Sequence, residues 1–260
     1  MPANPEARNL AVFCDFENVA LGVREAKYDK FDMEKVLERL LAKGSIVVKK
    51  AYCDWERYKE FKASMHSSAF ELIEIPHVRQ SGKNSADIRM VVDALDLCYT
   101  KGHVDTFVIV SGDSDFSPLV SKLRENAKTV IGVGVKNSSS DLLISNCDEF
   151  IYYDDLVRQD EQKRRAAKKR RESAPAGEDK RQEAIDLVLS TLEALTAERG
   201  AEEKIWGSMV KQALKRRNPG FNESYYGYKA FSDLLEDAEK KNLIKLEPDE
   251  KSGGYVIRPA

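Results

Sequence analysis

Acidic residues follow two apolar segments of this chain at the points where strands would end. Residues 10–14 lead directly into Asp15, and residues 107–110 lead into a turn that carries Asp113 and Asp115. Apolar runs of this length suit strands buried on both faces, and ligands of open α/β sheets bind beyond the carboxyl ends of such strands. Carboxylates at two of these ends could converge on one cation, and Mg2+ and Mn2+ prefer oxygen ligands. The pattern therefore predicts metal-dependent phosphoryl chemistry, in which a metal ion activates water against a phosphodiester.

Other polar residues stand where they could complete such a site. Asn18 could orient a water or a carboxylate, or it could cap a helix or form a turn. Lys83 and Asp87 lie where a helix is expected to begin, and the helix dipole favours anions there. Lys83 could thus receive a phosphate while Asp87 turns toward the metal. Asn84 stands where a P-loop needs Ser or Thr, so this segment is not expected to be a nucleotide loop.

Several of these acids also have simple structural interpretations. Asp113 or Asp115 alone could cap a helix, and Asp141 could either add one more acid or serve as a capping residue. Asp93 follows Asp87 by six residues, a spacing that puts the two on different faces of one helix. We therefore expect Asp87, rather than Asp93, to reach the site.

The composition favours a cytoplasmic protein. The chain is 42% hydrophobic and 33% charged, and no apolar stretch approaches the roughly 20 residues of a membrane helix. The N-terminus lacks the apolar region of a signal peptide. The four cysteines are widely spaced and have apolar neighbours, so buried thiols are expected rather than disulfides or zinc ligands. The three histidines have no metal-ligand spacing.

The first part of the chain alternates between strand and helix patterns. Strands are expected at residues 10–14, 46–53, 71–75, 106–110, 129–135 and 149–152, and helices at residues 32–42, 55–69, 85–99, 117–126 and 139–146. Such alternation predicts an α/β fold in which helices cover both faces of a mainly parallel sheet.

A basic segment divides the chain. The net charge of −2 is weak support for nucleic-acid binding, but Lys163, Arg164 and Arg165 belong to a dense basic run. This run could contact phosphates, or it could be the solvated face of a helix. Pro and Gly interrupt the helical pattern after it. We therefore expect a first domain of residues 1–157, a basic helix and linker at 158–178, and a second domain of residues 179–260.

The second domain has helices followed by a terminal hairpin. Helices are expected at residues 181–197, 206–216 and 227–241, and strands at residues 243–246 and 255–257. This order predicts a small winged-helix domain. Its expected core residues are Trp206, Leu214, Phe221, Phe231 and Leu235.

The same domain has a basic edge formed by Lys211, Lys215, Arg216 and Arg217. Next to it in sequence, Tyr225 and Tyr226 could stack on bases, or they could pack within the domain. The edge could therefore contact RNA.

Three segments together resemble the NYN domain, which belongs to the PIN-like ribonuclease fold. They are residues 13–18 (FCDFEN), 82–87 (GKNSAD) and 110–116 (VSGDSDF), and the resemblance covers roughly residues 7–157. It implies a nuclease that uses Mg2+ or Mn2+ and acts on single-stranded RNA. It also implies that Asp15, Asp87 and Asp113 match the metal-site acids, with Asp115 adjacent and Asn18 supporting them.

Residues 205–214 and 218–235 resemble the OST-HTH, or LOTUS, domain, and this resemblance covers about residues 179–258. It implies a winged-helix module that binds RNA or a protein partner. The favoured function is therefore a metal-dependent ribonuclease whose second domain holds RNA. The alternative is a non-catalytic RNA-binding or scaffold protein with an inactive PIN-like domain. A phosphatase with an aspartyl nucleophile is disfavoured, because no downstream Lys-bearing motif clearly completes such a site.

Overall fold

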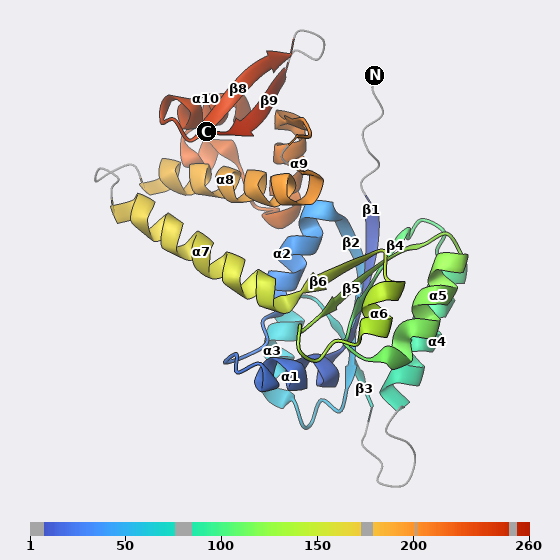
Figure 1. The fold of residues 1–260 in the computed structure, drawn as a ribbon. Helices are drawn as coiled ribbons and strands as arrows, with labels where there is room; N and C mark the ends of the chain where they lie inside the picture. Colours follow the sequence, from blue (N-terminus) through green and yellow to red (C-terminus); the bar gives the residue numbers. More distant parts are fainter. Residues whose placement is uncertain (1–7, 76–84, 173–178, 201, 250–253) are drawn as a thin grey trace. The chain divides into compact units, whose positions relative to one another are not determined.

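The computed structural model describes residues 8–75, 85–172, 179–200, 202–249 and 254–260. The chain divides into two compact units, one of Met1–Leu40 with Gly44–Arg158 and the other of Leu41–Lys43 with Gln159–Ala260 (Figure 1). The division into domains of residues 1–157 and 179–260, joined by residues 158–178, stays a prediction.

A six-stranded sheet forms the centre of the first unit. Its strands are β1 (Arg8–Asp15), β2 (Gly44–Cys53), β3 (Glu71–Glu74), β4 (Thr106–Val110), β5 (Thr129–Gly134) and β6 (Glu149–Tyr152). They lie in the order β3-β2-β1-β4-β5-β6, and every neighbouring pair is parallel. Residues 10–15 of β1 and all residues of β4 are buried. The predicted parallel sheet is thus confirmed, and the carboxyl ends of β1 and β4 lie side by side.

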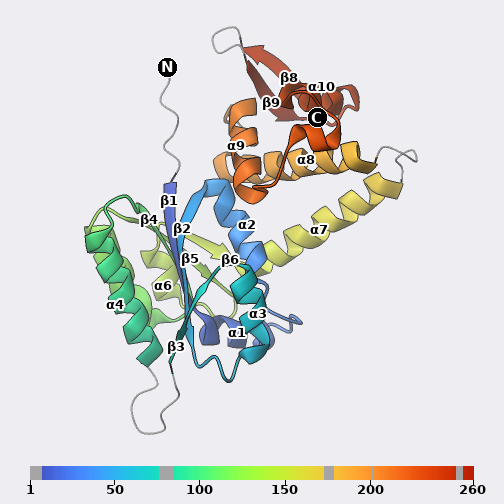
Figure 2. The same cartoon turned by 180° about the vertical axis from the view of Figure 1, so that it is seen from behind.

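Helices cover both faces of this sheet (Figures 1 and 2). They are α1 (Phe16–Glu25), α2 (Met33–Lys43), α3 (Lys59–Ser67), α4 (Ser85–Thr100), the short 3-10 helix η1 (Ser114–Phe116), α5 (Ser117–Glu125) and α6 (Asp141–Asn146). Helix α7 (Tyr153–Glu172) follows β6, and its residues from Gln159 on belong to the second unit. Alternate residues of β1 point to opposite faces. Val12 packs in the core of the face with α1, α2 and α3, whereas Phe13 packs in that of the face with α4, α5 and α6.

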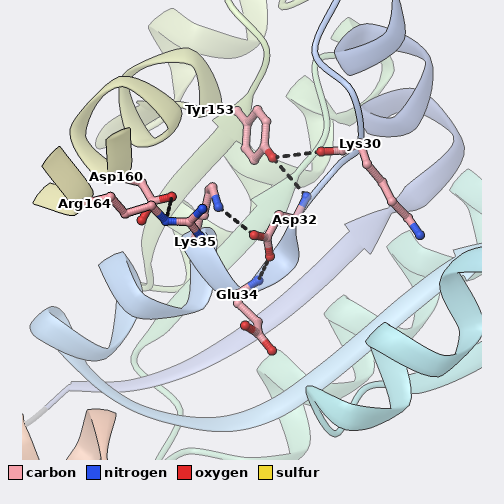
Figure 3. Close-up of polar contacts among 7 residues, drawn as sticks. All are labelled: Lys30, Asp32, Glu34, Lys35, Tyr153, Asp160 and Arg164. Carbon is pink, nitrogen blue, oxygen red and sulfur yellow. Dashed lines mark hydrogen bonds and ion pairs between the residues drawn. The ribbon is translucent and has the colours of Figure 1, made fainter. Parts of the chain in front are cut away.

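A buried tyrosine fixes the start of α2. The Tyr153 hydroxyl accepts a hydrogen bond from the Asp32 backbone nitrogen at 2.9 Å and lies 3.4 Å from the Lys30 carbonyl oxygen (Figure 3). The Asp32 carboxylate accepts from the Glu34 backbone nitrogen at 3.0 Å and from Lys35 Nζ at 2.6 Å. Asp32 therefore caps the helix with its side chain, while its own backbone nitrogen is satisfied by Tyr153.

Helix α1 was not expected from the sequence. It follows β1 with no loop residue between them, because Asp15 ends the strand and caps the helix. Gly22 lies inside the helix and weakens the helical pattern. A Cβ atom at this position would lie 2.4 Å from Ser138 Oγ, so glycine permits the close approach of the loop that contains Ser138. Helix α3 also begins later than expected, since residues 55–58 form a turn.

The second unit contains helices and a small antiparallel sheet. Its elements are α8 (Asp179–Arg199), β7 (Ile205–Trp206), α9 (Gly207–Arg217), η2 (Glu223–Tyr226), α10 (Phe231–Lys240), β8 (Ile244–Asp249) and β9 (Gly254–Pro259). The sheet has the order β7-β9-β8.

Two expectations for this unit were wrong. The sheet has three strands rather than two, because Ile205 and Trp206 pair with Ile257 and Val256 of β9. Trp206 consequently belongs to a strand instead of a helix, and its side chain is only half-buried. The other four expected core residues are buried, namely Leu214, Phe221, Phe231 and Leu235.

Two further expectations concern the cysteines and membrane-spanning helices. All four cysteines are free thiols; Cys14, Cys53 and Cys98 are buried and Cys147 is half-buried. No helix in the described ranges is long and apolar enough to cross a membrane.

Candidate active site

Asp15 lies at the centre of the candidate site. It is the last residue of β1 and the N-cap of α1, and it is only 8% exposed. Its Oδ2 accepts a hydrogen bond from Ser111 Oγ at 3.0 Å, and its Oδ1 accepts from the Asn18 backbone nitrogen at 3.4 Å. Because the strand runs directly into the helix, this carboxylate is held at the carboxyl edge of the sheet.

The turn after β4 is tied to α1 and to Asp15. Asn18 Oδ1 accepts from the Gly112 backbone nitrogen at 2.8 Å, and Ser111 Oγ accepts from the Asp113 backbone nitrogen at 3.2 Å. The buried hydroxyl of Ser111 thus joins two acids that come from neighbouring strands. Sequence reasoning assigned no role to Ser111, although its place between a buried strand and a Gly-Asp turn was a signal for one.

The remaining predicted acids come from η1 and α4. Asp113 is half-buried and caps η1, since its Oδ1 accepts from the Asp115 backbone nitrogen at 2.9 Å. Asp115 is exposed in η1, and Asp87 is half-buried in the first turn of α4. The capping interpretation of Asp113 is therefore correct, and its second oxygen remains available for other roles.

The acids of this cluster raise one another's pKa values. The pKa of Asp15 is raised to about 7, mainly by burial and secondly by the nearby charge of Asp87. The hydrogen bond from Ser111 acts in the opposite direction and lowers this pKa in part. Burial and the charges of Asp113 and Asp115 raise the pKa of Asp87 to about 6. In the described part of the chain, no lysine or arginine forms an ion pair with Asp15, Asp87 or Asp113. Among the residues that the structure describes, negative charge is therefore concentrated here without an ion-paired cation.

The donor chemistry of this cluster fits a divalent cation. Carboxylate oxygens are the ligands that Mg2+ and Mn2+ prefer, and a cation would relieve the repulsion that raises both pKa values. Within the described ranges, no group of three or more His, Cys, Asp and Glu side chains is gathered closely enough to hold a metal ion. Asp15, Asp87 and Asp113 have oxygens of the suitable kind, but their side chains would have to move to bind one ion together.

Other acids near the cluster have different partners. Asp93 accepts hydrogen bonds from the Tyr52 hydroxyl at 2.8 Å and from Arg89 Nε at 3.0 Å, and it lies 3.4 Å from Lys50 Nζ. Burial acts to raise the pKa of Asp93, but these three partners lower it overall. Asp93 is therefore a neutralised structural acid.

Two more acids are not buried in the cluster, although the charge of Glu17 also contributes to the raised pKa of Asp87. Glu17 forms an ion pair with Arg57 at 3.1 Å. Asp141 is exposed in the first turn of α6, where Ser140 supplies the capping side chain. Neither arrangement adds a buried carboxylate to the site.

The predicted basic residues of the join are only partly described. Lys83 and the side chain of Lys163 lie outside the described part of the structure. Arg164 pairs with Asp160 at 3.2 Å (Figure 3). Arg165 lies 3.8 Å from Glu161, also within α7. Both arginines remain exposed, so these pairs compete only weakly with a phosphate.

The four residues of the basic edge in the second unit differ in their partners and in their exposure. Lys211 pairs with Glu223 at 2.7 Å, and Arg217 Nη1 donates to Thr191 Oγ1 at 2.9 Å. Arg216 is half-buried, and burial lowers its pKa. Lys215 is exposed on the same helix. Of these four residues, Lys215 is the one most open to a ligand.

The two adjacent tyrosines of η2 also differ in exposure. Tyr225 is 62% exposed, and its ring lies edge-on to Tyr226 with centroids 5.0 Å apart. Lys180 Nζ lies 4.4 Å from the Tyr225 ring centroid. An exposed aromatic ring beside a lysine is compatible with base stacking.

Comparison with known proteins identifies the family of the first unit. Residues 9–154, more than half of the chain, match the NYN domain. The chain is a member of the NYN domain family. This family consists of PIN-like nucleases. The match ends at residue 154, and the C-terminal region is not assigned to a family.

Two proteins similar to this chain are of unknown function. An uncharacterized protein of Methanocaldococcus jannaschii is 28% identical over 120 residues, which span 46% of this chain and 47% of that protein. The match thus covers about half of the relative's length. A crystal structure of a Vibrio parahaemolyticus protein of unknown function has 27% identity and a TM-score of 0.53, covering 59% of this chain and 98% of the other.

Proposed function

We propose that the first unit is a divalent-metal-dependent ribonuclease that hydrolyses phosphodiester bonds of single-stranded RNA. The observation that carries this proposal is the buried carboxylate of Asp15, whose pKa is raised by burial and by Asp87. Keeping an uncompensated acid in a buried position costs stability, and strongly perturbed acids cluster at functional sites. Membership of a PIN-like nuclease family supports the same function.

Each residue of the site has a distinct part in this proposal. Asp15, Asp87 and Asp113 would hold Mg2+ or Mn2+, which supplies an activated water and neutralises charge on the phosphate. Ser111 and Asn18 hold the ends of β1 and β4 in register through the hydrogen bonds described above. Asp115, exposed beside these acids, would orient the attacking water. Lys83 would bind a phosphate of the RNA.

We further propose that the second unit is a LOTUS-like winged-helix module that holds RNA or a protein partner. In the part of this unit that the structure describes, helices α8, α9 and α10 and the three-stranded antiparallel sheet are compatible with that shape. Its proposed RNA contacts are Lys211, Lys215, Arg216 and Arg217, together with Lys163, Arg164 and Arg165 of α7. The exposed Lys215 and the Tyr225 ring beside Lys180 favour this interpretation.

Cleavage of labelled single-stranded RNA by the full chain tests the first proposal. Asp15→Asn and Asp113→Asn should each abolish the products while RNA binding is retained. Glu34→Gln, which changes an exposed acid of α2, is the matched control and should cleave like the parent protein. Products that survive both aspartate substitutions would remove these residues from the mechanism. RNA binding without products in the parent protein would favour the non-catalytic alternative.

A further inference from the structure

Exposed apolar side chains gather on one surface of the first unit. In the described part of this unit, five large apolar side chains are exposed, and four of them belong to α4 and α6: Ile88, Val92, Tyr99 and Leu142. Their exposed fractions run from 55% to 65%. Leu142 lines the same groove as Ile88 and Val92, so α6 extends the apolar surface of α4. Contiguous surfaces of this kind mark interaction sites on soluble proteins.

The apolar residues of α4 have a regular spacing. Four of them follow one another at intervals of four, three and four positions and form what we call the α4 stripe: Ile88, Val92, half-buried Leu95 and Tyr99. This alternation places side chains on one side of a helix, and it is the pattern by which two helices pack together. The buried residues of α4 lie on another side of the helix and pack on the sheet: Met90, Ala94 and Cys98. The α4 stripe therefore runs for about 16 Å along the exposed side of the helix.

Two residues of opposite charge flank the α4 stripe on one side. Arg89 and Asp96 are both exposed, and their spacing of seven residues places them two turns apart on the same side of the helix. Arg89 Nε donates to Asp93 at 3.0 Å, and the terminal nitrogens of the guanidinium have four further N–H groups to donate. Among the described residues, Asp96 forms no ion pair. The middle of this charged pair lies within one residue of the middle of the stripe.

This arrangement of apolar and charged residues is complementary to itself. When two α4 helices lie antiparallel about a two-fold axis through the middle of the stripe, the first stripe residue of each copy meets the last one of the other copy. The same rotation brings Arg89 of each copy opposite Asp96 of the other. A parallel pairing would instead place like charges at the same level. Symmetric dimers use one patch on both chains in this reciprocal way, and they are the commonest oligomers of soluble proteins.

We propose that the α4 stripe is a dimer interface, on which the α4 helix of a second copy of this chain packs in the antiparallel orientation. Burial of the two stripes supplies the attraction, and the two Arg89–Asp96 pairs between the chains fix the orientation and the register. The interface is independent of the proposed ribonuclease activity, because the stripe contains none of the acids assigned to the metal. Asp87 lies one residue before the stripe, so the two acidic clusters lie at opposite ends of the helix pair, roughly 20 Å apart along its axis.

Sedimentation equilibrium of the full chain tests this interface. The parent protein should sediment with twice the chain mass of 29.4 kDa. Val92→Lys should raise the dissociation constant by about tenfold or more, because it places a charge in the apolar contact of both copies. Val47→Lys changes an exposed valine of β2 and is the matched control, which should stay within about twofold of the parent protein. A parent protein that is monomeric at about 0.1 mM, or an unchanged dissociation constant for Val92→Lys, would overturn the proposal.

Exchange of the two charges tests the antiparallel orientation. Arg89→Glu and Asp96→Lys each bring two pairs of like charges together, so each alone should weaken the dimer by about tenfold or more. The double variant Arg89→Glu/Asp96→Lys restores opposite charges and should return to within about threefold of the parent dissociation constant. Within one chain the two residues lie about 10 Å apart along the helix, so this recovery reports a contact between chains. A double variant as weak as the single variants would overturn the antiparallel pairing.

Circular dichroism separates a lost interface from a lost fold. Lysine is a good helix former, so the spectrum and the thermal unfolding of Val92→Lys at micromolar concentration should match those of the Val47→Lys control. A monomeric Val92→Lys protein with the parent spectrum supports the interface. If the dimer persists in folded Val92→Lys protein, the two chains meet at another surface and the α4 stripe is not the interface.

Discussion

Asp15→Asn should stabilise the metal-free protein at alkaline pH. The fold raises the pKa of Asp15 from 3.8 to about 7, so ionised Asp15 opposes folding. A shift of one pKa unit corresponds to about 1.4 kcal/mol, which sets an upper bound of about 4 kcal/mol for this effect. An asparagine keeps the shape of the side chain but carries no charge, although it fits the hydrogen bond from Ser111 less well. We therefore expect a net stabilisation of about 2 kcal/mol.

The pH dependence has a definite sign. The folded protein holds a proton on Asp15 up to about pH 7, whereas the unfolded chain releases it near pH 3.8. Between these values the folded state binds more protons, so the stability of the parent protein falls as pH rises. Above about pH 7 this loss of stability is complete. The stabilisation by Asp15→Asn should therefore be smallest at the acidic end of the window and reach its full size above it.

Urea unfolding with a chelator present measures this difference. The chain contains two tryptophans, and Trp55 is buried in the first unit. A Trp206→Phe background makes the fluorescence report on Trp55, and so on the first unit. Glu34→Gln serves as the control for loss of one exposed negative charge. A destabilising effect of Asp15→Asn above the window, or a difference that does not vary with pH, would refute the reasoning.

Three further outcomes follow from the same geometry. Ser111→Ala removes a hydrogen bond that lowers the pKa of Asp15, so NMR titration should find this pKa raised further. The same substitution should lower the free energy of unfolding in urea by about 1–2 kcal/mol. Gly112→Ala would place a Cβ atom 2.5 Å from the Ser138 carbonyl oxygen, so thermal unfolding should show a loss of about 2 kcal/mol or more. Saturating Mn2+ should raise the Tm of the parent protein by relieving repulsion among the acids, and Asp15→Asn with Asp113→Asn should lose most of this rise. An unchanged Tm would argue against a metal site here.

The sheet was largely predictable because burial leaves a strong pattern in the sequence. β4 and β6 have the expected bounds, and β1 extends the expected strand by a few residues. Both faces of β1 and β4 are covered by helices, so their residues form continuous apolar runs. The acidic ends of the two strands could therefore be placed at one edge before the structure was known.

Features that depend on tertiary contacts were not predictable. Helix α1 contains a glycine whose presence makes sense only through the loop at Ser138. The pairing of Trp206 with β9 overrides the helical pattern that follows it. Local sequence carries no record of such approaches between distant segments.

The most direct test of the central claim is a cleavage time course on labelled single-stranded RNA. The full chain and Asp15→Asn/Asp113→Asn are each incubated with Mg2+, with Mn2+ and with a chelator. The account predicts products from the parent protein only with a divalent metal, and none from the double variant. Equal product formation by the parent protein and the double variant, or cleavage by the parent that continues in the chelator, would contradict it.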